Sequence, residues 1–250
     1  MHNVTANGAA IPALGFGTFR MEDAEVAAVL PEALRLGFRH IDTAQVYGNE
    51  AAVGAAIRAS GVPRDEIFLT TKVWVTEFAK ADFLPAVEES LKKLGVDHVD
   101  LLLHWLHRND TPRAMQIAEL NKTVAKGMAR HIGVSNYNAA KMHEAAELSY
   151  APLTANPVEY HPYLSQAAIL KACKEMGMAL TGYYGMADGL VPQDEVLKDI
   201  GAAHGKTAAQ VALRWLVQQP RVVTLSKTAK LKRLPENFGI FDFDLSAAER

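Results

Sequence analysis

Four side chains that can exchange protons stand just beyond short apolar runs in the first half of the sequence. Asp42 and Tyr47 lie in the segment GFRHIDTAQVYGNE, Lys72 lies beyond the run IFL, and His104 follows LLL. Such runs predict buried strands, and the C-terminal ends of parallel strands are where barrel enzymes carry their chemistry. An acid, a phenol, an ammonium and an imidazole gathered there would move a proton to or from a substrate.

Each of these residues also has an ordinary structural explanation. A strand-terminal Asp is commonly a cap or turn former, a loop tyrosine usually packs half-buried, and a lone histidine is often a satisfied core residue. Four such side chains at the ends of three predicted strands favour catalysis instead. Side-chain alternation lets Lys72 face the barrel interior, with Asp42 as its counter-ion.

Strand and helix patterns alternate from end to end, which is the sequence form of a parallel α/β sheet. Eight strands predict a (β/α)8 TIM barrel, and we expect residues 1–250 to form a single domain. The expected strands are residues 14–18, 38–44, 67–73, 99–105, 131–136, 154–159, 179–184 and 221–225.

Composition limits the class of ligand. Lys plus Arg number 26 against 28 Asp plus Glu, so no strong field attracts nucleic acid or an anionic membrane. The sequence has no signal-like N-terminus and no run that could cross a bilayer, which predicts a cytoplasmic protein. The single cysteine, Cys173, excludes an intramolecular disulfide and favours inert packing. We expect a small-molecule substrate, and a monomer or weak homo-oligomer.

Five ordered motifs together resemble the aldo-keto reductases, in the branch of bacterial 2,5-diketo-gluconate and methylglyoxal reductases. The motifs are GFRHIDTAQVYGNE, TTKVW, the HW of DLLLHW, HIGVSNY and VEYHPYL. The resemblance covers the chain from about residue 11 to residue 250. It implies a barrel with a short N-terminal hairpin, here residues 4–11, and the reduction of small aldehydes, α-ketoaldehydes or diketo sugars.

By this resemblance Asp42, Tyr47, Lys72 and His104 correspond to a catalytic tetrad. Tyr47 would be the general acid, because the ammonium of Lys72 favours phenolate and brings the proton closer to transfer. His104 would hold the substrate carbonyl oxygen beside Tyr47 with a hydrogen bond from its neutral tautomer. No metal is required.

Hydride must come from a cofactor, because no side chain supplies one. No convincing GxGxxG opens a strand–helix unit, so we expect no Rossmann domain. The resemblance implies a nicotinamide dinucleotide, with Ser135 and Asn136 at its carboxamide and Tyr183 stacked on its nicotinamide. The remaining implied cofactor residues are Thr18 and, at the adenosine end, Lys227, Thr228, Arg233, Glu236 and Asn237.

Two cations and three aromatic residues refine this expectation. Lys227 and Arg233 would meet a 2′-phosphate after the last strand, which predicts NADPH over NADH. The alternative is a solvated basic surface that includes the neighbouring lysines. Apolar walls for the substrate would come from Phe19, Trp74 and Trp105.

Several positions depart from the family pattern. Pro157 stands where relatives usually have a Gln that contacts the carboxamide, and Pro offers no donor. Pro235 lies inside the expected adenosine-binding helix, so we expect that helix to be short or distorted. The other replaced positions are Leu106, Tyr184, Gly185 and Ser226.

One departure is geometric. Three leucines separate Asp100 from His104, where relatives commonly have four residues. Because strand side chains alternate between faces, a missing residue inverts the assignment on one side of it unless a bulge absorbs the slip. We predict that His104 keeps its inward place and that the irregularity lies upstream. A regular strand with His104 facing the helix layer would contradict the tetrad.

The last residues predict an incomplete outer layer. Ser246 and Glu249 match a capping box, which predicts the start of a helix just before the final Arg250. We therefore expect the last outer helix to be truncated or missing and the substrate mouth to lack a covering tail. Such a site would be open and weakly selective.

Two other functions stay open on the sequence. A barrel that keeps the tetrad but uses the cofactor poorly would act as a ligand-binding or regulatory module, and Pro157 and the missing covering tail both favour this alternative. A barrel lyase would use Lys72 as a Schiff base, and Asp42 beside it does not exclude that chemistry.

Overall fold

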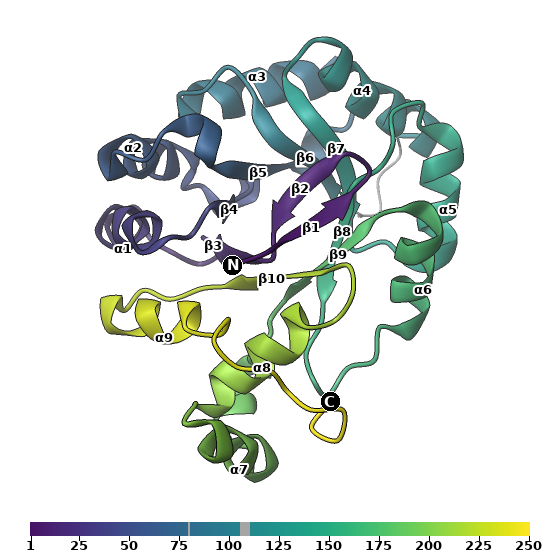
Figure 1. The fold of residues 1–250 in the computed structure, drawn as a ribbon. Helices are drawn as coiled ribbons and strands as arrows, with labels where there is room; N and C mark the ends of the chain where they lie inside the picture. The colour runs from purple at the N-terminus through teal and green to yellow at the C-terminus, as the bar shows by residue number, and fades with distance from the viewer. Residues whose placement is uncertain (80, 106–110) are drawn as a thin grey trace.

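The computed structural model describes residues 1–79, 81–105 and 111–250, except for the side chain of Trp105. Within these residues, eight parallel strands curve into a barrel with helices outside it (Figure 1). The strands are β3 (Leu14–Gly17), β4 (His40–Asp42), β5 (Phe68–Val73), β6 (Val99–Trp105), β7 (Ala129–Ser135), β8 (Ala155–Glu159), β9 (Ala179–Tyr183) and β10 (Val222–Ser226). Their ends lie within two residues of the expected ones, and the TIM-barrel prediction is confirmed.

The sheet runs in the order β7-β6-β5-β4-β3-β10-β9-β8, so β10 joins the first barrel strand, β3. Between β7 and β8 the ladder thins to single bonds. The Thr154 amide donates to the Ile132 carbonyl at 2.8 Å, and the Asn136 amide donates to the Pro157 carbonyl at 2.9 Å. The barrel is therefore nearly closed, which leaves few unpaired strand edges.

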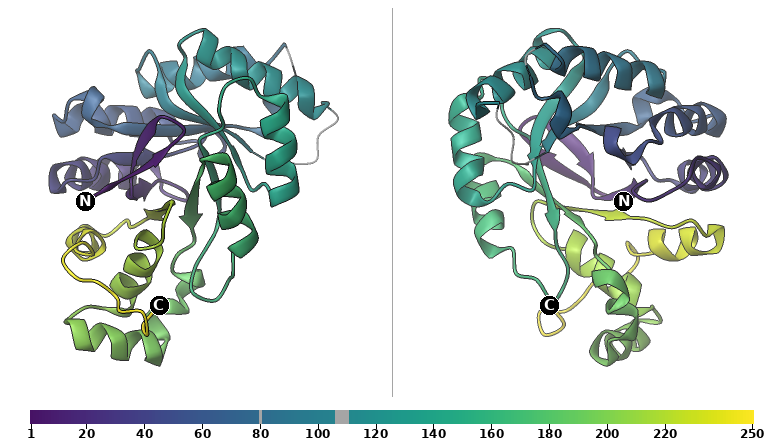
Figure 2. Two further views of the ribbon diagram at one scale, coloured as in Figure 1. Left: turned by 45° about the vertical axis from the view of Figure 1, so that its right-hand side comes forward. Right: turned by 180° about the vertical axis from the view of Figure 1, so that it is seen from behind.

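Helices cover the outside of the sheet in both views of Figure 2. They are α1 (Asp23–Leu36), α2 (Glu50–Ser60), α3 (Phe83–Leu94), α4 (Arg113–Ala125), α5 (Ala139–Leu148), α6 (Ala167–Met176), α7 (Glu195–His204), α8 (Ala208–Val217) and α9 (Leu234–Phe238). No helix in the described ranges has the length and apolar character needed to cross a bilayer. α8 begins at the expected capping box of Thr207 and Gln210.

Close packing of two outer helices depends on a glycine. A Cβ atom on Gly54 of α2 would lie 2.2 Å from the Leu94 carbonyl oxygen at the end of α3. Real Cβ atoms do not approach a carbonyl oxygen so closely. Only glycine therefore lets the two helices pack at this separation.

The expected N-terminal hairpin is present as β1 (Asn3–Ala6) and β2 (Ala9–Pro12). Its turn residues, Asn7 and Gly8, both have positive φ, as a two-residue hairpin turn requires. The Asn7 side chain donates to the carbonyls of Leu153 and Met176 at 2.6 and 3.0 Å. The turn is thereby fixed to the segments before β8 and at the end of α6.

The last part of the described chain contains one short helix and a turn. α9 has five residues, with Pro235 near its start, which confirms the expectation of a short helix. After it, within the described residues, Ser246 and Glu249 make a single turn, in which the Ser246 amide donates to Glu249 Oε2 at 2.7 Å.

Candidate active site

Three of the four predicted catalytic side chains meet inside the C-terminal end of the barrel. Asp42 ends β4, Lys72 lies near the end of β5, and Tyr47 lies in the short turn η1 (Gln45–Tyr47). Lys72 Nζ donates to Asp42 Oδ1 at 2.6 Å, to the Thr43 carbonyl at 2.8 Å and to the Tyr47 hydroxyl at 3.4 Å. The charged side chains are each only 4% exposed, so Asp42 and Lys72 form a buried ion pair directed at the phenol.

The surroundings keep protons on both Lys72 and Tyr47 in the resting protein. Burial alone would lower the pKa of Lys72, but the Asp42 carboxylate and the Tyr47 hydroxyl outweigh it, and the pKa is raised. Burial raises the pKa of Tyr47, and the ammonium of Lys72 opposes part of that rise. A protonated phenol beside a permanent cation is suited to giving up its proton, because the cation stabilises the phenolate left behind.

Asn49 joins the turn that carries Tyr47 to the loop that carries Phe19. Its buried side-chain amide donates to the carbonyls of Thr18 and Met21, each at 3.0 Å. The Phe19 ring lies 5.0 Å from the Tyr47 ring between centroids, at a tilt of 50°. The phenol therefore has an apolar neighbour in Phe19, and the Lys72 ammonium lies 5.0 Å from the centre of its ring.

His104 lies on the opposite face of β6. The register aligns it with Val73, the residue after Lys72, and aligned residues of neighbouring parallel strands share a face. Its ring stacks on Phe78 at 4.0 Å between centroids, and its Nδ1 lies 3.0 Å from the Tyr137 hydroxyl. His104 faces the helix layer, so the prediction that it faces the barrel interior beside Tyr47 is wrong.

The cause is the missing residue in β6. The strand pairs residue by residue with β7 from Leu101 to Trp105, so no bulge compensates for the missing residue. Because side chains alternate between faces, His104 takes the face opposite to the expected one. Burial lowers the pKa of His104 to about 4, and Gln116 offsets only part of that effect. The imidazole is therefore a neutral packing group behind the barrel wall.

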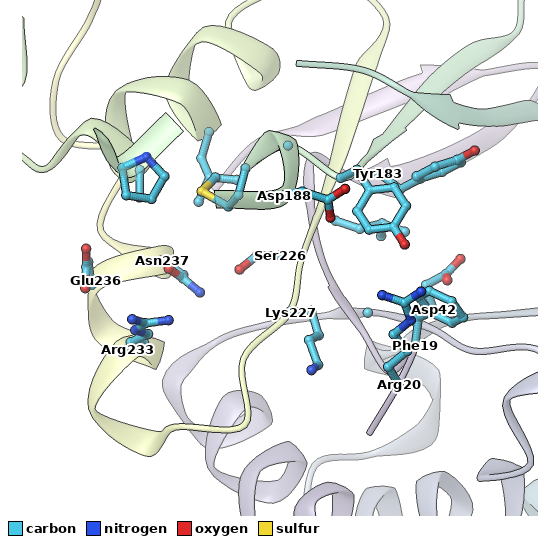
Figure 3. Close-up of a pocket in the computed structure, with 18 of the residues that line it drawn as sticks. Phe19, Arg20, Asp42, Tyr183, Asp188, Ser226, Lys227, Arg233, Glu236 and Asn237 are labelled. Atoms are coloured by element: carbon cyan, nitrogen blue, oxygen red, sulfur yellow. The ribbon is translucent and has the colours of Figure 1, made fainter. Parts of the chain in front are cut away.

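A cavity of about 900 Å³ opens at Asp42, Tyr47 and Lys72 and reaches the helices that flank β10. Figure 3 shows Asp42, Phe19 and Tyr183 at one end and Lys227 with Ser226 between the two ends. The labelled residues at the far end are Arg233, Glu236 and Asn237.

Six of the nine expected cofactor residues line this cavity: Ser135, Tyr183, Lys227, Arg233, Glu236 and Asn237. The other three lie outside the described lining and support it. Thr18 donates to the Asp42 carbonyl at 3.2 Å, and Thr228 accepts from the backbone of its own loop. Asn136 accepts from the Tyr183 hydroxyl at 2.6 Å and so orients that ring.

The expected substrate walls are only partly present. Phe19 lines the cavity, as do the replaced residues Pro157, Tyr184, Gly185 and Ser226. Trp74 is half-buried outside the described lining, and its backbone amide donates to Gln45 Oε1 at 2.7 Å. The Trp105 side chain and Leu106 lie outside the part of the chain that the structure describes.

The match to known proteins agrees with this geometry. The model of the aldo/keto reductase family matches residues 13–250. The chain belongs to the aldo-keto reductase family. Methylglyoxal reductase DkgB of Escherichia coli O157:H7 is 40% identical over 244 residues, which cover 96% of this chain and 91% of that protein. Glyoxal reductase of Bacillus subtilis (strain 168) is 39% identical over 245 residues, which cover 96% and 87%.

A solved structure extends the likeness to three dimensions. It is described as a "putative 2,5-diketo-D-gluconic acid reductase B", with 59% identity, a TM-score of 0.99, and coverage of 100% of this chain and 89% of that one. The shared family supports carbonyl reduction by this aldo-keto reductase as its general chemistry.

Sequence reasoning missed several charged residues that line the cavity of this aldo-keto reductase: Arg20, Asp188, Lys198 and Lys206. Only Arg20 has a sequence signal, because it directly follows Thr18 and Phe19, which were both expected at the site. The other three belong to the long connection between β9 and α8, where no periodicity indicates which side chains turn toward β10.

Proposed function

We propose that this aldo-keto reductase converts small aldehydes and ketones, including α-ketoaldehydes and diketo sugars, to alcohols with NADPH, and that Tyr47 donates the proton. The observation that carries the proposal is the contact of Lys72 Nζ with the Tyr47 hydroxyl at the inner end of a 900 Å³ cavity. The names of the relatives, methylglyoxal reductase and glyoxal reductase, support this substrate class.

The chain's own residues handle the proton. When bound, the cofactor supplies a hydride, two electrons and one proton, to the carbonyl carbon. The Tyr47 hydroxyl gives its proton to the carbonyl oxygen, which completes the alcohol. Lys72 stabilises the phenolate that remains, and Asp42 keeps Lys72 charged. Because Tyr47 is only partly buried, water can return the proton.

The cavity fits a dinucleotide with a 2′-phosphate. Neither Lys227 nor Arg233 has an ion-pair partner among the described residues, so one cation in the middle of the cavity and one at its far end are available to an external anion. Glu236 accepts from the Thr207 hydroxyl at 2.8 Å, which holds α9 against the start of α8. At the other end Ser135 and the ring of Tyr183 would hold the nicotinamide.

The position of His104 makes turnover slow in this proposal. Removing one preorganised donor to a developing oxyanion typically costs about 10²–10³ in kcat. The same position, with Pro157 offering no donor, favours a second candidate: a nucleotide-binding module without useful turnover. The lyase alternative loses support, because the Lys72 ammonium has three acceptors and its pKa is raised, so a free amine for Schiff-base formation is disfavoured.

The test measures binding and turnover separately. NADPH and NADH are titrated against intrinsic fluorescence, and the absorbance of the reduced cofactor is then followed with methylglyoxal for the parent and for Tyr47→Phe. We expect tighter binding of NADPH, weakened by Arg233→Ala, and oxidation that Tyr47→Phe abolishes. Binding without turnover would support the module, and absence of binding would overturn both functions.

A further inference from the structure

A chain of hydrogen bonds on the helix side of β5 connects the segments on either side of Tyr47 and Lys72. The Trp74 amide, two residues after Lys72, donates to Gln45 Oε1 at 2.7 Å. Gln45 begins the turn that carries Tyr47, and its Nε2 donates to Ser90 Oγ of α3 at 2.9 Å. The catalytic turn is thus bonded at its first residue both to the end of β5 and to α3.

The same chain continues to the other side of the turn. The Ser90 hydroxyl donates to Glu50 Oε2 at 3.2 Å, and the Thr71 hydroxyl donates to Glu50 Oε1 at 2.6 Å. Glu50 begins α2 three residues after Tyr47, and Thr71 directly precedes Lys72. Residues flanking the phenol are therefore linked to residues flanking the ammonium, with Ser90 joining the two halves.

This network is buried and energetically demanding. Ser90 is 1% exposed, Glu50 2% and Thr71 0%. Burial raises the pKa of Glu50, and the two hydroxyl donors oppose part of that rise. Burying a carboxyl group costs free energy unless its oxygens are hydrogen-bonded, and the hydroxyls of Ser90 and Thr71 offset that cost. An apolar contact between the same segments would not carry this cost. None of the three lines the described cavity.

We propose that Gln45, Ser90 and Glu50 are positioning residues that set the separation between the Tyr47 hydroxyl and Lys72. At 3.4 Å this contact lies near the outer limit of a hydrogen bond, so a small outward shift of the turn would break it. The network prevents that shift without touching substrate. Its kinetic consequence rests on the proposed reductase function, but the geometric claim does not.

The experiment compares two disrupting variants with a matched control. Ser90→Ala and Gln45→Met remove bonds in the network and keep the side-chain bulk close to the original. Ser60→Ala removes another buried hydroxyl, at the opposite end of α2, where it bonds only within its own turn. All three should lower the thermal midpoint, so stability alone does not separate the positions.

The kinetic readout does separate them. We expect kcat for methylglyoxal to fall about 10- to 100-fold in Ser90→Ala and Gln45→Met, with KM within about twofold, since a misplacement near 1 Å can cost 10²-fold. The alkaline limb of the kcat profile should move to higher pH, because Lys72 stabilises the phenolate less. Changes no larger than those of Ser60→Ala would overturn the proposal.

A second readout works without turnover. The absorbance of ionised tyrosine is measured against pH in the cofactor-free protein, and the curve of the Tyr47→Phe variant is subtracted to isolate Tyr47. The titration stays within the pH range where circular dichroism shows the folded state. Ser90→Ala and Gln45→Met should move the Tyr47 step to higher pH, and Ser60→Ala should not. An unmoved step refutes the positioning role even if the protein proves to be a reductase, and a moved step supports it even if it does not.

Discussion

Replacing His104 should affect stability far more than catalysis. The family motif places a histidine in the tetrad, but the register of β6 turns this one to the helix layer. His104→Leu keeps an apolar body of similar size in the same place and removes the imidazole. If His104 does not reach the substrate, kcat/KM for methylglyoxal should change less than about tenfold, instead of the roughly 10²–10³ expected for a lost oxyanion donor.

The stability cost follows from what His104 contacts. The Tyr137 hydroxyl, in a side chain 1% exposed, loses its partner, which costs about 1–3 kcal/mol for a buried unsatisfied group. The ring stacked on Phe78 is also lost, which costs about 0.5–1.5 kcal/mol. We expect the free energy of unfolding to fall by about 2–4 kcal/mol, and Tyr137→Phe in the same chain to recover about 1 kcal/mol or more, because it removes the orphaned hydroxyl.

The assay pairs urea unfolding with steady-state kinetics on His104→Leu, Tyr47→Phe and the parent. The reasoning would be refuted if His104→Leu lost as much kcat/KM as Tyr47→Phe while its urea midpoint stayed at the parent value. The reciprocal change inserts one leucine between Leu103 and His104. It restores four residues after Asp100, should turn the imidazole into the cavity and should raise kcat.

Three further results are expected. Lys72→Met leaves the buried Asp42 carboxylate unpaired and should destabilise the protein by about 3–5 kcal/mol in urea unfolding near neutral pH, with most of the loss recovered by adding Asp42→Asn. Burial lowers the pKa of both His40 and His104 to about 4, so below pH 6.5 the unfolded chain takes up protons that the folded chain does not. Acid should therefore reduce the free energy of unfolding by up to about 3 kcal/mol per histidine between pH 6.5 and 4, and His104→Leu should remove its share of that slope. Gly54→Ala should force α2 away from α3 and destabilise by about 1–3 kcal/mol, seen as a lower thermal midpoint; an unchanged midpoint would contradict the packing argument.

The barrel and its ion pair were accessible from sequence because both depend on local signals. Apolar runs bounded by turn residues placed each strand within two residues of its observed ends. Alternation within β5 was enough to direct Lys72 inward, and Asp42 at the end of the neighbouring strand followed as its partner. These inferences require no knowledge of which segments lie beside one another beyond the strand order of a barrel.

What sequence reasoning missed depends on contacts between distant segments. Ser90 lies far along the chain from Gln45, and nothing in the helical pattern of α3 distinguishes it from an ordinary buried serine. Thr18, Asn136 and Thr228, which were expected to touch the cofactor, lie outside the described lining and bond to backbone or to other side chains, and their contact with the cofactor stays a prediction. A family motif identifies which residues gather near a site, but not the layer in which each one lies.

The cost of a bulge in β6 explains why His104 faces the helix layer and not the barrel interior. A bulge in β6 would have kept the histidine inward, but β6 is bonded on both sides, to β5 and to β7, so a bulge interrupts two ladders at once. Each lost ladder bond costs about 0.5–1.5 kcal/mol net. A regular strand avoids that cost, and on its outer face the Tyr137 hydroxyl lies within hydrogen-bond distance of His104 Nδ1 while the Phe78 ring stacks on the imidazole. Fold stability therefore favours the regular strand, and in the proposed reduction Tyr47 and Lys72 act without the histidine.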